Sequence, residues 1–296
     1  MAHDHSHSHT PKSFGKAFAI GIILNSAYVA IEAFYGILIN SSALLADAGH
    51  NASDVFSLIL AWAAIWICEK KPSGKYTYGL RKTTILASMF NGLLIIGAAV
   101  FILYDAVQKF QSPVEVPGNT IMIVAAIGIV INTATALLFM KGQNDLNIKG
   151  AFLHMAADAA VTLGVLIGGL VMKFTGAYWV DPTLSILIVL VILYGAWNLL
   201  SDSIKLAVDA VPGDIDIDKV QEMLSRLEGV EEVHDLHIWA MSTTETALTA
   251  HLVIPGGCED QDIFKIREML KDKFGIDHST LQIEKTFEDH EYREKI

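Results

Sequence analysis

Residues 118–140 read GNTIMIVAAIGIVINTATALLFM and contain no ionisable side chain. As a helix that rises about 1.5 Å per residue, this stretch is long enough to cross the roughly 30 Å hydrocarbon core of a bilayer. Lipid offers backbone groups no hydrogen-bond partners, so a helix is the natural spanning form. Five more apolar segments of similar length are present: 16–38, 42–67, 83–108, 148–173 and 178–200. We therefore predict an α-helical membrane protein with six transmembrane helices.

The net charge of the chain is concentrated in its last third. Of the 296 residues, 52% are hydrophobic and only 18% are charged, and the net charge is −11. With 9 Lys/Arg and 21 Asp/Glu, residues 206–296 alone carry a net charge of −12. Such an acidic surface argues against nucleic acid as a partner and favours cations. We expect a His-rich cytosolic arm (1–15), a transmembrane domain (16–205) and a cytosolic domain (206–296).

Basic residues lie on alternate sides of the expected spans. The N-terminal arm and the loops after the second and fourth segments hold nine lysines and arginines, whereas the other loops hold only Lys109 and Lys173. The positive-inside rule then predicts that both termini lie in the cytoplasm. We expect a multi-pass protein of the inner membrane. The polar, His-rich start lacks the features of a cleavable signal peptide, and we expect none.

The acidic tail has the pattern of a small α+β domain. Helical periodicity predicts helices over Asp214–Leu227 and Asp260–Phe274, and Gly275 ends the second. Alternating residues predict three strands: Val230–Met241, Glu245–Pro255 and Ser279–Lys285. The order αββαβ predicts an open-faced domain of ferredoxin-like or metallochaperone-like type.

Two pairs of metal-binding side chains lie inside the apolar segments. His50 and Asp54 are four residues apart in the second segment, and His154 and Asp158 are four apart in the fifth. Residues four apart share one helical face, so each pair can present two ligands to one point. The pairs lie about 15 Å and 14 Å from opposite ends of their segments, which places both near mid-membrane. Two imidazole nitrogens and two carboxylate oxygens can form the tetrahedral site that Zn²⁺ accepts.

Polar groups inside a membrane also have structural uses. For one intramembrane Asp, hydrogen bonding between helices or a water-filled cavity is an equally good explanation, but two matched pairs favour a cation pathway. Glu32 and Asp47 are candidates for groups just outside the ligands or for a proton pathway. Three amides are expected to be hydrogen-bond partners between helices: Asn51, Asn91 and Asn132.

Six stretches of the chain together resemble the cation diffusion facilitator family, in the bacterial form that exports zinc, cadmium and cobalt. They are LLADAGHNASD (44–54), KYTYGLRKTTILA (75–87), GAFLHMAADA (150–159), Asp181-Pro182, VHDLHIW (233–239) and HSTLQIE (278–284). The resemblance covers nearly the whole chain. It implies a homodimer that exchanges Zn²⁺ for protons, with the transport site at four residues: His50, Asp54, His154 and Asp158.

The resemblance also implies a regulatory metal site in the cytosolic domain. Its motifs fall on His234, His251 and Glu284, and more weakly on His237 and His278. The first three would converge near one edge of the predicted sheet; ordinary, partly exposed histidines on strands are the alternative. The family's best-known form has a His and an Asp in the last strand, and Gln282 and Glu284 replace them, which weakens the prediction of two metal ions.

The family has a further metal site in the loop after the second segment. Here that loop contains no histidine, and Cys68 and Glu69 alone make a poor cage. We expect this site to be absent or vestigial.

The chemistry of the intramembrane pairs predicts that metal movement is coupled to protons. A free histidine has a pKa of about 6.5, and a metal requires neutral imidazole and ionised carboxylate, so loading releases protons. We expect an antiporter that exports Zn²⁺, and also Cd²⁺ or Co²⁺, from the cytoplasm. The lack of thiolate argues against Cu⁺, and the ligands match Mg²⁺ poorly. Zn²⁺ is expected both as substrate and as regulatory ligand.

Other features leave alternatives open. Alternating histidines in the N-terminal arm form either a cation-gathering tract or an inessential tail: His3, His5, His7 and His9. A membrane metal sensor and an unrelated channel are alternative functions, although no output domain is apparent. There is no phosphate loop, nucleotide motif or nucleophile arrangement, so we expect neither ATP-driven transport nor an enzyme.

Overall fold

The structure, a computed structural model, describes most of the chain: residues 15–68, 70–139 and 146–286. The chain forms two compact units, one of residues 1–59 and 93–197, the other of residues 60–92 and 198–296. The His-rich arm with its four alternating histidines lies outside the described residues.

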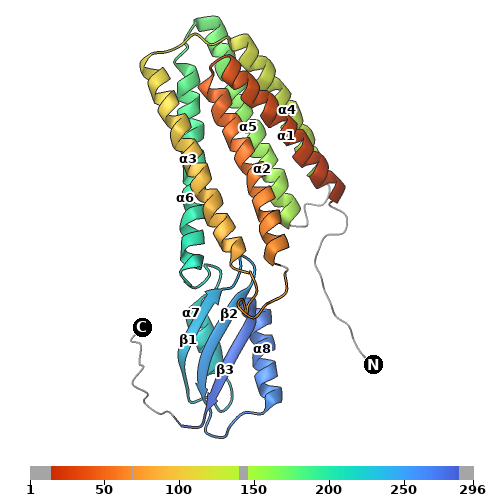
Figure 1. The fold of residues 1–296 in the computed structure, drawn as a ribbon, viewed down its shortest axis with the longest axis vertical. Helices are drawn as coiled ribbons and strands as arrows, with labels where there is room; N and C mark the ends of the chain where they lie inside the picture. The colour runs from red at the N-terminus through yellow and green to blue at the C-terminus, as the bar shows by residue number, and fades with distance from the viewer. Residues whose placement is uncertain (1–14, 69, 140–145, 287–296) are drawn as a thin grey trace. The chain divides into compact units, whose positions relative to one another are not determined.

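Six long helices make up most of the chain, and each overlaps one of the six predicted apolar segments (Figure 1). They are α1 (Gly15–Leu38), α2 (Ser42–Cys68), α3 (Thr83–Gln111), α4 (Gly118–Phe139), α5 (Leu146–Thr175) and α6 (Val180–Ala207). Judged on the described residues, four of them are long and apolar enough to cross a membrane, namely α3, α4, α5 and α6. The described apolar part of α1 is shorter, Ile22–Leu38.

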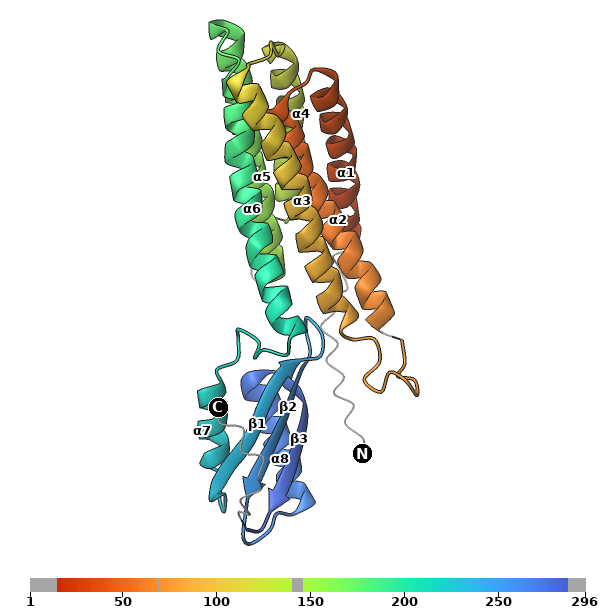
Figure 2. The same cartoon turned by 60° about the vertical axis from the view of Figure 1, so that its left-hand side comes forward.

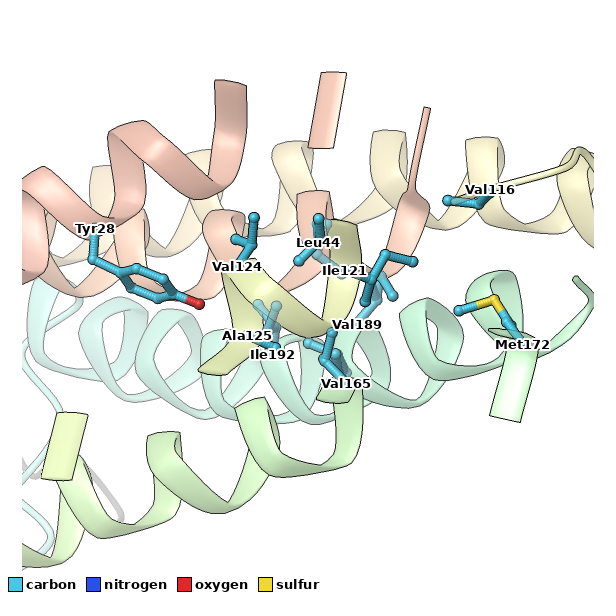
Figure 3. Close-up of a cluster of buried hydrophobic side chains, with 14 residues drawn as sticks. Tyr28, Leu44, Val116, Ile121, Val124, Ala125, Val165, Met172, Val189 and Ile192 are labelled. Atoms are coloured by element: carbon cyan, nitrogen blue, oxygen red, sulfur yellow. The ribbon is translucent and has the colours of Figure 1, made fainter. Parts of the chain in front are cut away.

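In the first unit, α4 lies against both α1 and α5. Glycines permit this close packing: Gly118 of α4 approaches the backbone of Gly169 in α5, and Gly128 of α4 lies close to Tyr28 of α1. In lipid, helices associate largely through van der Waals contacts, which small residues strengthen by letting backbones approach. Buried side chains from these and the other long helices form one apolar cluster (Figure 3).

The start of α2 is held by a residue of α6. The Asp181 carboxylate accepts hydrogen bonds from the Ser41 hydroxyl (2.5 Å) and from the main-chain N–H groups of Ser42 (2.7 Å) and Ala43 (3.4 Å). The first N–H groups of a helix lack partners within the helix, and a negative charge there also suits the helix dipole. Asp181 therefore caps α2 from another helix and fixes where α2 begins.

The second unit contains a small domain with the predicted order αββαβ. Its elements are α7 (Ile217–Ser225), β1 (Glu232–Ala240), β2 (Thr246–Val253), α8 (Asp260–Phe274) and β3 (Ile276–Glu284). The strand order is β1-β2-β3, with β1 antiparallel and β3 parallel to β2. β3 begins three residues earlier than predicted, because Gly275 (φ 67°) ends α8 in the left-handed conformation and the chain extends immediately.

Both helices of this domain cover the same face of its sheet (Figure 2). Leu224 of α7 and Leu270 of α8 are completely buried together with Leu248 and Leu252 of β2. Because side chains alternate along a strand, His251 points to the opposite, open face.

Candidate metal sites

The two predicted intramembrane pairs meet between α2 and α5. His50 Nε2 lies 3.3 Å from Asp158 Oδ1 on the other helix. Likewise, His154 Nε2 lies 3.2 Å from Asp54 Oδ2. The separations within each helix are longer, 3.9 Å for the pair on α2 and 3.7 Å for the pair on α5. Each imidazole thus lies closest to a carboxylate of the opposite helix.

Access to this group of four residues is uneven. The Asp158 side chain is only 2% exposed and that of His50 is 23% exposed. The Asp54 and His154 side chains are 36% and 43% exposed. Within this group, the Asp158 side chain is therefore the most buried and the His154 side chain the most exposed.

The donor set suits a divalent transition metal. One ligand atom each from His50, Asp54 and Asp158 lies within 4.8 Å of the others. Zn²⁺ binds such nitrogen and oxygen donors at about 2.0–2.2 Å, so the three atoms would have to move closer together to bind one ion. His154 lies outside that tightest set, and it joins through its contacts with Asp54 and Asp158. An ion bound here would replace the contacts between imidazoles and carboxylates.

The polar residues next to these ligands have structural contacts of their own. Asn51 joins two helices as predicted, since its Nδ2 donates to Glu32 Oε2 (3.4 Å). The side-chain amide of Asn132 is buried and has no hydrogen-bond partner within the described residues, so the prediction of a bond between helices is wrong there. Glu32 and Asp47 are both completely buried.

The cytosolic trio also comes together. His234 Nε2 lies 3.0 Å from Glu284 Oε2, and His251 Nδ1 lies 2.9 Å from Glu284 Oε1. The two imidazole rings are 5.1 Å apart between centroids. The sequence predicted that the trio would lie near one edge of the sheet. Instead, one residue comes from each strand, and His251 lies on the central strand β2. It therefore lies across the open face, where an ion can approach from solvent.

The surroundings of Glu284 favour the ionised form of its carboxyl group. Its partial burial alone would raise the pKa of its carboxyl, but hydrogen bonds with Gln282 and His234 and the nearby charges of His234 and His251 outweigh burial and lower it. Gln282 Nε2 donates to Glu284 Oε1 at 2.8 Å. The residue that replaces the family's histidine thus orients the carboxylate.

Asp235 was missed by the sequence reasoning. It lies in a bulge of β1 with φ 51°, and its carboxylate lies 3.0 Å from His237 Nε2 and 3.5 Å from His251 Nε2. A bulge shifts the strand register, which alternation in the sequence does not reveal. His237 is therefore paired with Asp235 and not with the trio. His278 packs its ring against Tyr78 (5.8 Å between centroids) and is not part of the close ligand group in the described chain.

The sequence also matches models of known protein families. The sequence model of the cation efflux transmembrane domain matches residues 18–206, more than half of the chain. The chain belongs to the cation diffusion facilitator family. The model of the cytoplasmic domain of cation efflux proteins matches residues 212–286 of this facilitator. The resemblance found in the motifs is confirmed.

Curated relatives align with this cation diffusion facilitator over nearly its whole length. The "Cadmium, cobalt and zinc/H(+)-K(+) antiporter" of Bacillus velezensis is 35% identical, over 97% of this chain and 94% of its own. The "Metal cation efflux system protein CzcD" of Cupriavidus metallidurans is 35% identical, over 96% and 90%. The "Zinc transporter ZitB" of Escherichia coli is 32% identical, over 96% and 93%.

Membership of the cation diffusion facilitators sets the class of function. The chain is a multi-pass membrane transporter of the divalent cation efflux type, and it is not an enzyme. The metal site that the family has in the loop after the second helix cannot be followed here, because Glu69 lies outside the described residues.

Proposed function

We propose that this chain exports Zn²⁺, and also Cd²⁺ and Co²⁺, from the cytoplasm in exchange for protons. The proposed carrier site is the tetrahedral set described above: His50, Asp54, His154 and Asp158. The observation that carries the proposal is the crossed contact of the two pairs, in which each imidazole lies 3.2–3.3 Å from a carboxylate of the other helix. Two nitrogen and two oxygen donors suit Zn²⁺, and this set has no thiolate to favour Cu⁺.

The same four groups can exchange metal for protons. A protonated imidazole makes an ion pair with the carboxylate that it contacts, whereas a metal needs neutral imidazole and ionised carboxylate. Arrival of the ion therefore expels protons, and protons arriving from the other side expel the ion. Because a free histidine titrates near neutral pH, an inward proton gradient can drive the metal outward through such an exchange. The Bacillus velezensis relative is named as a zinc/H⁺-K⁺ antiporter, which agrees with such coupling.

The membrane topology is part of the proposal. All six long helices span the inner membrane, both termini are cytoplasmic, and the carrier site is reached from either side in turn. The transmembrane domain comprises residues 16–205, and residues 206–296 form the cytosolic domain. Basic residues on alternate sides of the helices support this orientation.

The cytosolic trio is proposed to bind a second Zn²⁺ as a regulatory ligand. His234, His251 and Glu284 supply two imidazoles and a carboxylate on the open face of the sheet, with contacts of 2.9–3.0 Å. The chain is proposed to act as a homodimer, in keeping with the cytoplasmic-domain model that it matches. Two acidic tails in one dimer repel each other, and bound cations reduce that repulsion.

Zinc uptake into proteoliposomes that contain the full chain tests the carrier site. With an acidic interior, protons leave as zinc enters, so we expect the imposed gradient to accelerate uptake by the wild type. Asp54→Ala and His154→Ala should abolish uptake, because each removes a ligand. Asp202→Asn is the matched control, since the exposed Asp202 carboxylate contacts only Lys205 among the ion pairs described.

The outcomes separate the parts of the proposal. If zinc uptake is the same with and without the pH gradient, but His154→Ala still abolishes it, transport is not coupled to protons. Zinc binding that depends on Asp54 without any flux indicates a metal sensor instead of a carrier. Unchanged uptake in both variants rules out this set of ligands.

A further inference from the structure

A carboxyl pair, Glu32 of α1 and Asp47 of α2, lies beside the carrier site without supplying a ligand to it. Both side chains are completely buried. Tyr28 Oη donates to Glu32 Oε1 (2.7 Å), and Asn51 Nδ2 donates to Glu32 Oε2 (3.4 Å). On the other member of the pair, Thr162 Oγ1 of α5 donates to Asp47 Oδ2 (3.1 Å). Three helices thus converge on two acidic groups that are closed off from solvent.

The carboxyl pair has too few hydrogen-bond donors. The two carboxyl groups are close enough to interact with each other. An ionised carboxylate can only accept, so a contact between two carboxylates contains no donor. Asp47 Oδ1 is buried and has no hydrogen-bond partner anywhere in the described chain. A buried acceptor without a donor is costly, and a proton on one carboxyl supplies what is missing.

The surroundings offer the pair little positive charge. Among the described residues, the other ionisable groups with the largest effect on it are Tyr28 of α1, His50 of α2 and Asp158 of α5. Only His50 can be positive, and its Nε2 already lies 3.3 Å from Asp158. The helix α4, which packs against α1, contains no ionisable residue. Two adjacent buried carboxylates repel each other in such surroundings, and a proton shared between them removes that repulsion.

We propose that Glu32 and Asp47 form a proton-binding site separate from the metal ligands, which holds one shared proton when the carrier site is empty and releases it when the metal arrives. On release, the carboxyl O–H bond breaks and the proton leaves to water, while both carboxylates stay ionised opposite the divalent ion. This inference rests on the proposed carrier site. It adds a proton to those displaced from the ligands themselves.

Thr162 provides a physical connection between the pair and the carrier site. Its Oγ1 lies 3.1 Å from Asp47 Oδ2 and 2.9 Å from the main-chain oxygen of Asp158, and its single proton serves one acceptor at a time. Asp47 also lies less than one turn before His50 on α2. Charges interact strongly in a buried environment. The two positive charges of a metal ion bound at Asp158 and His50 would therefore favour ionisation of the carboxyl pair.

Infrared difference spectroscopy on the full chain in lipid nanodiscs tests this site, because a neutral carboxyl has a carbonyl band that a carboxylate lacks. We expect the wild type to show this band near neutral pH and to lose it when Zn²⁺ is added. Glu32→Gln and Asp47→Asn should each remove the band, since either amide leaves a single ionised carboxylate with a donor beside it. Each variant should still bind Zn²⁺ and release about one proton fewer per ion. Asp202→Asn is the control and should keep the band.

A second variant covers the case in which these substitutions disturb folding. Tyr28→Phe keeps both carboxyl groups and removes only the donor to Glu32, so it should shift the frequency of the band without abolishing it. The inference is overturned if the band persists in both amide variants or is absent from the wild type. It is also overturned if Tyr28→Phe leaves the frequency of the band unchanged. The absence of the band from the wild type together with a dependence on K⁺ would point to a bound alkali cation.

The failure of the carrier proposal can be recognised separately. Spectra recorded against pH need no metal, so they test the carboxyl pair even if Asp54→Ala leaves zinc transport intact.

Discussion

At the scale of single residues, His251 determines how the cytosolic trio is oriented. Its Nδ1 lies 2.9 Å from Glu284 Oε1, and its Nε2 lies 3.5 Å from Asp235 Oδ2. A histidine that binds metal through one nitrogen commonly donates its other N–H to a carboxylate, which fixes the tautomer and raises the basicity of the ligand. The bulge at Asp235 therefore places a positioning residue behind His251.

Asp235→Asn should weaken zinc binding at the trio by about 10–100-fold, because the amide no longer fixes the tautomer of His251. Competition with a chromogenic zinc chelator measures this, in an Asp54→Ala background that removes the carrier site. His278→Ala is the matched control, since His278 packs against Tyr78. An equal loss of affinity in both variants, or in neither, contradicts the role assigned to Asp235.

At the scale of elements, the crossing of α1 and α4 depends on one glycine. A Cβ added at Gly128 would overlap the ring and hydroxyl of Tyr28. Tyr28 is completely buried, and its hydroxyl donates to Glu32, so it cannot move aside without losing that bond. The absence of a side chain at Gly128 is thus what lets the two helices approach while Glu32 keeps its donor.

Gly128→Ala should destabilise the folded chain by about 1–3 kcal/mol, the usual cost of overpacking a buried contact. Gly195→Ala is the matched control in α6, because no atom lies within 4 Å of a Cβ added there. It should be neutral, or stabilising by less than about 1 kcal/mol, since alanine favours a helix over glycine. Thermal unfolding in detergent compares the two. Equal stability of both variants would show that Tyr28 adapts freely.

Much of this level of structure could be predicted from the sequence. Apolar length located the six helices, because a helix that must hide its backbone from lipid needs a continuous apolar segment. The helix α6 nevertheless continues to Ala207, past the apolar segment that ends at residue 200, since backbone hydrogen bonds propagate a helix after its apolar residues stop. Spacing also predicted that His50 and Asp54 share a face, and that His154 and Asp158 do.

Other features depend on packing or on local backbone conformations that the sequence does not reveal. Which imidazole meets which carboxylate is set by the rotation of α2 against α5, and only packing decides that. Both the bulge in β1 and the early start of β3 at Ile276 come from local backbone conformations with positive φ. Asp235 has a φ of 51°, and Gly275, directly before β3, has a φ of 67°. The left-handed conformation at Asp235 is uncommon for a residue with a side chain, so the sequence favours a regular strand there.

At the scale of the whole molecule, charge is separated along the chain. The acidic tail (residues 206–296) has a net charge of −12, whereas the rest is close to neutral. In the proposed homodimer, two such tails repel each other. Zinc bound at the trio, as proposed, would place positive charge among His234, His251 and Glu284 and would reduce the repulsion there. Dissolved salt screens the repulsion without occupying a site, over a Debye length of about 8 Å at physiological ionic strength.

Zinc should therefore bring the two tails of a dimer closer together. Spin labels on Cys258, in a Cys68→Ser background, measure the distance between copies by pulsed electron resonance in the full-length protein. We expect Zn²⁺ to shorten this distance. Mg²⁺ at the same concentration should have a much smaller effect, because it prefers to keep its waters and suits oxygen ligands better than imidazoles.

His251→Ala separates site binding from general screening, because it removes a ligand of the trio and leaves the net charge of the tail unchanged. This variant should lose the shortening caused by zinc but keep the smaller shortening caused by raised salt. If zinc at saturation leaves the distance unchanged in the wild type, repulsion between the tails does not control how far apart they lie. If zinc and Mg²⁺ act equally and His251→Ala changes nothing, the acidic surface as a whole responds to cations, and the trio has no regulatory role.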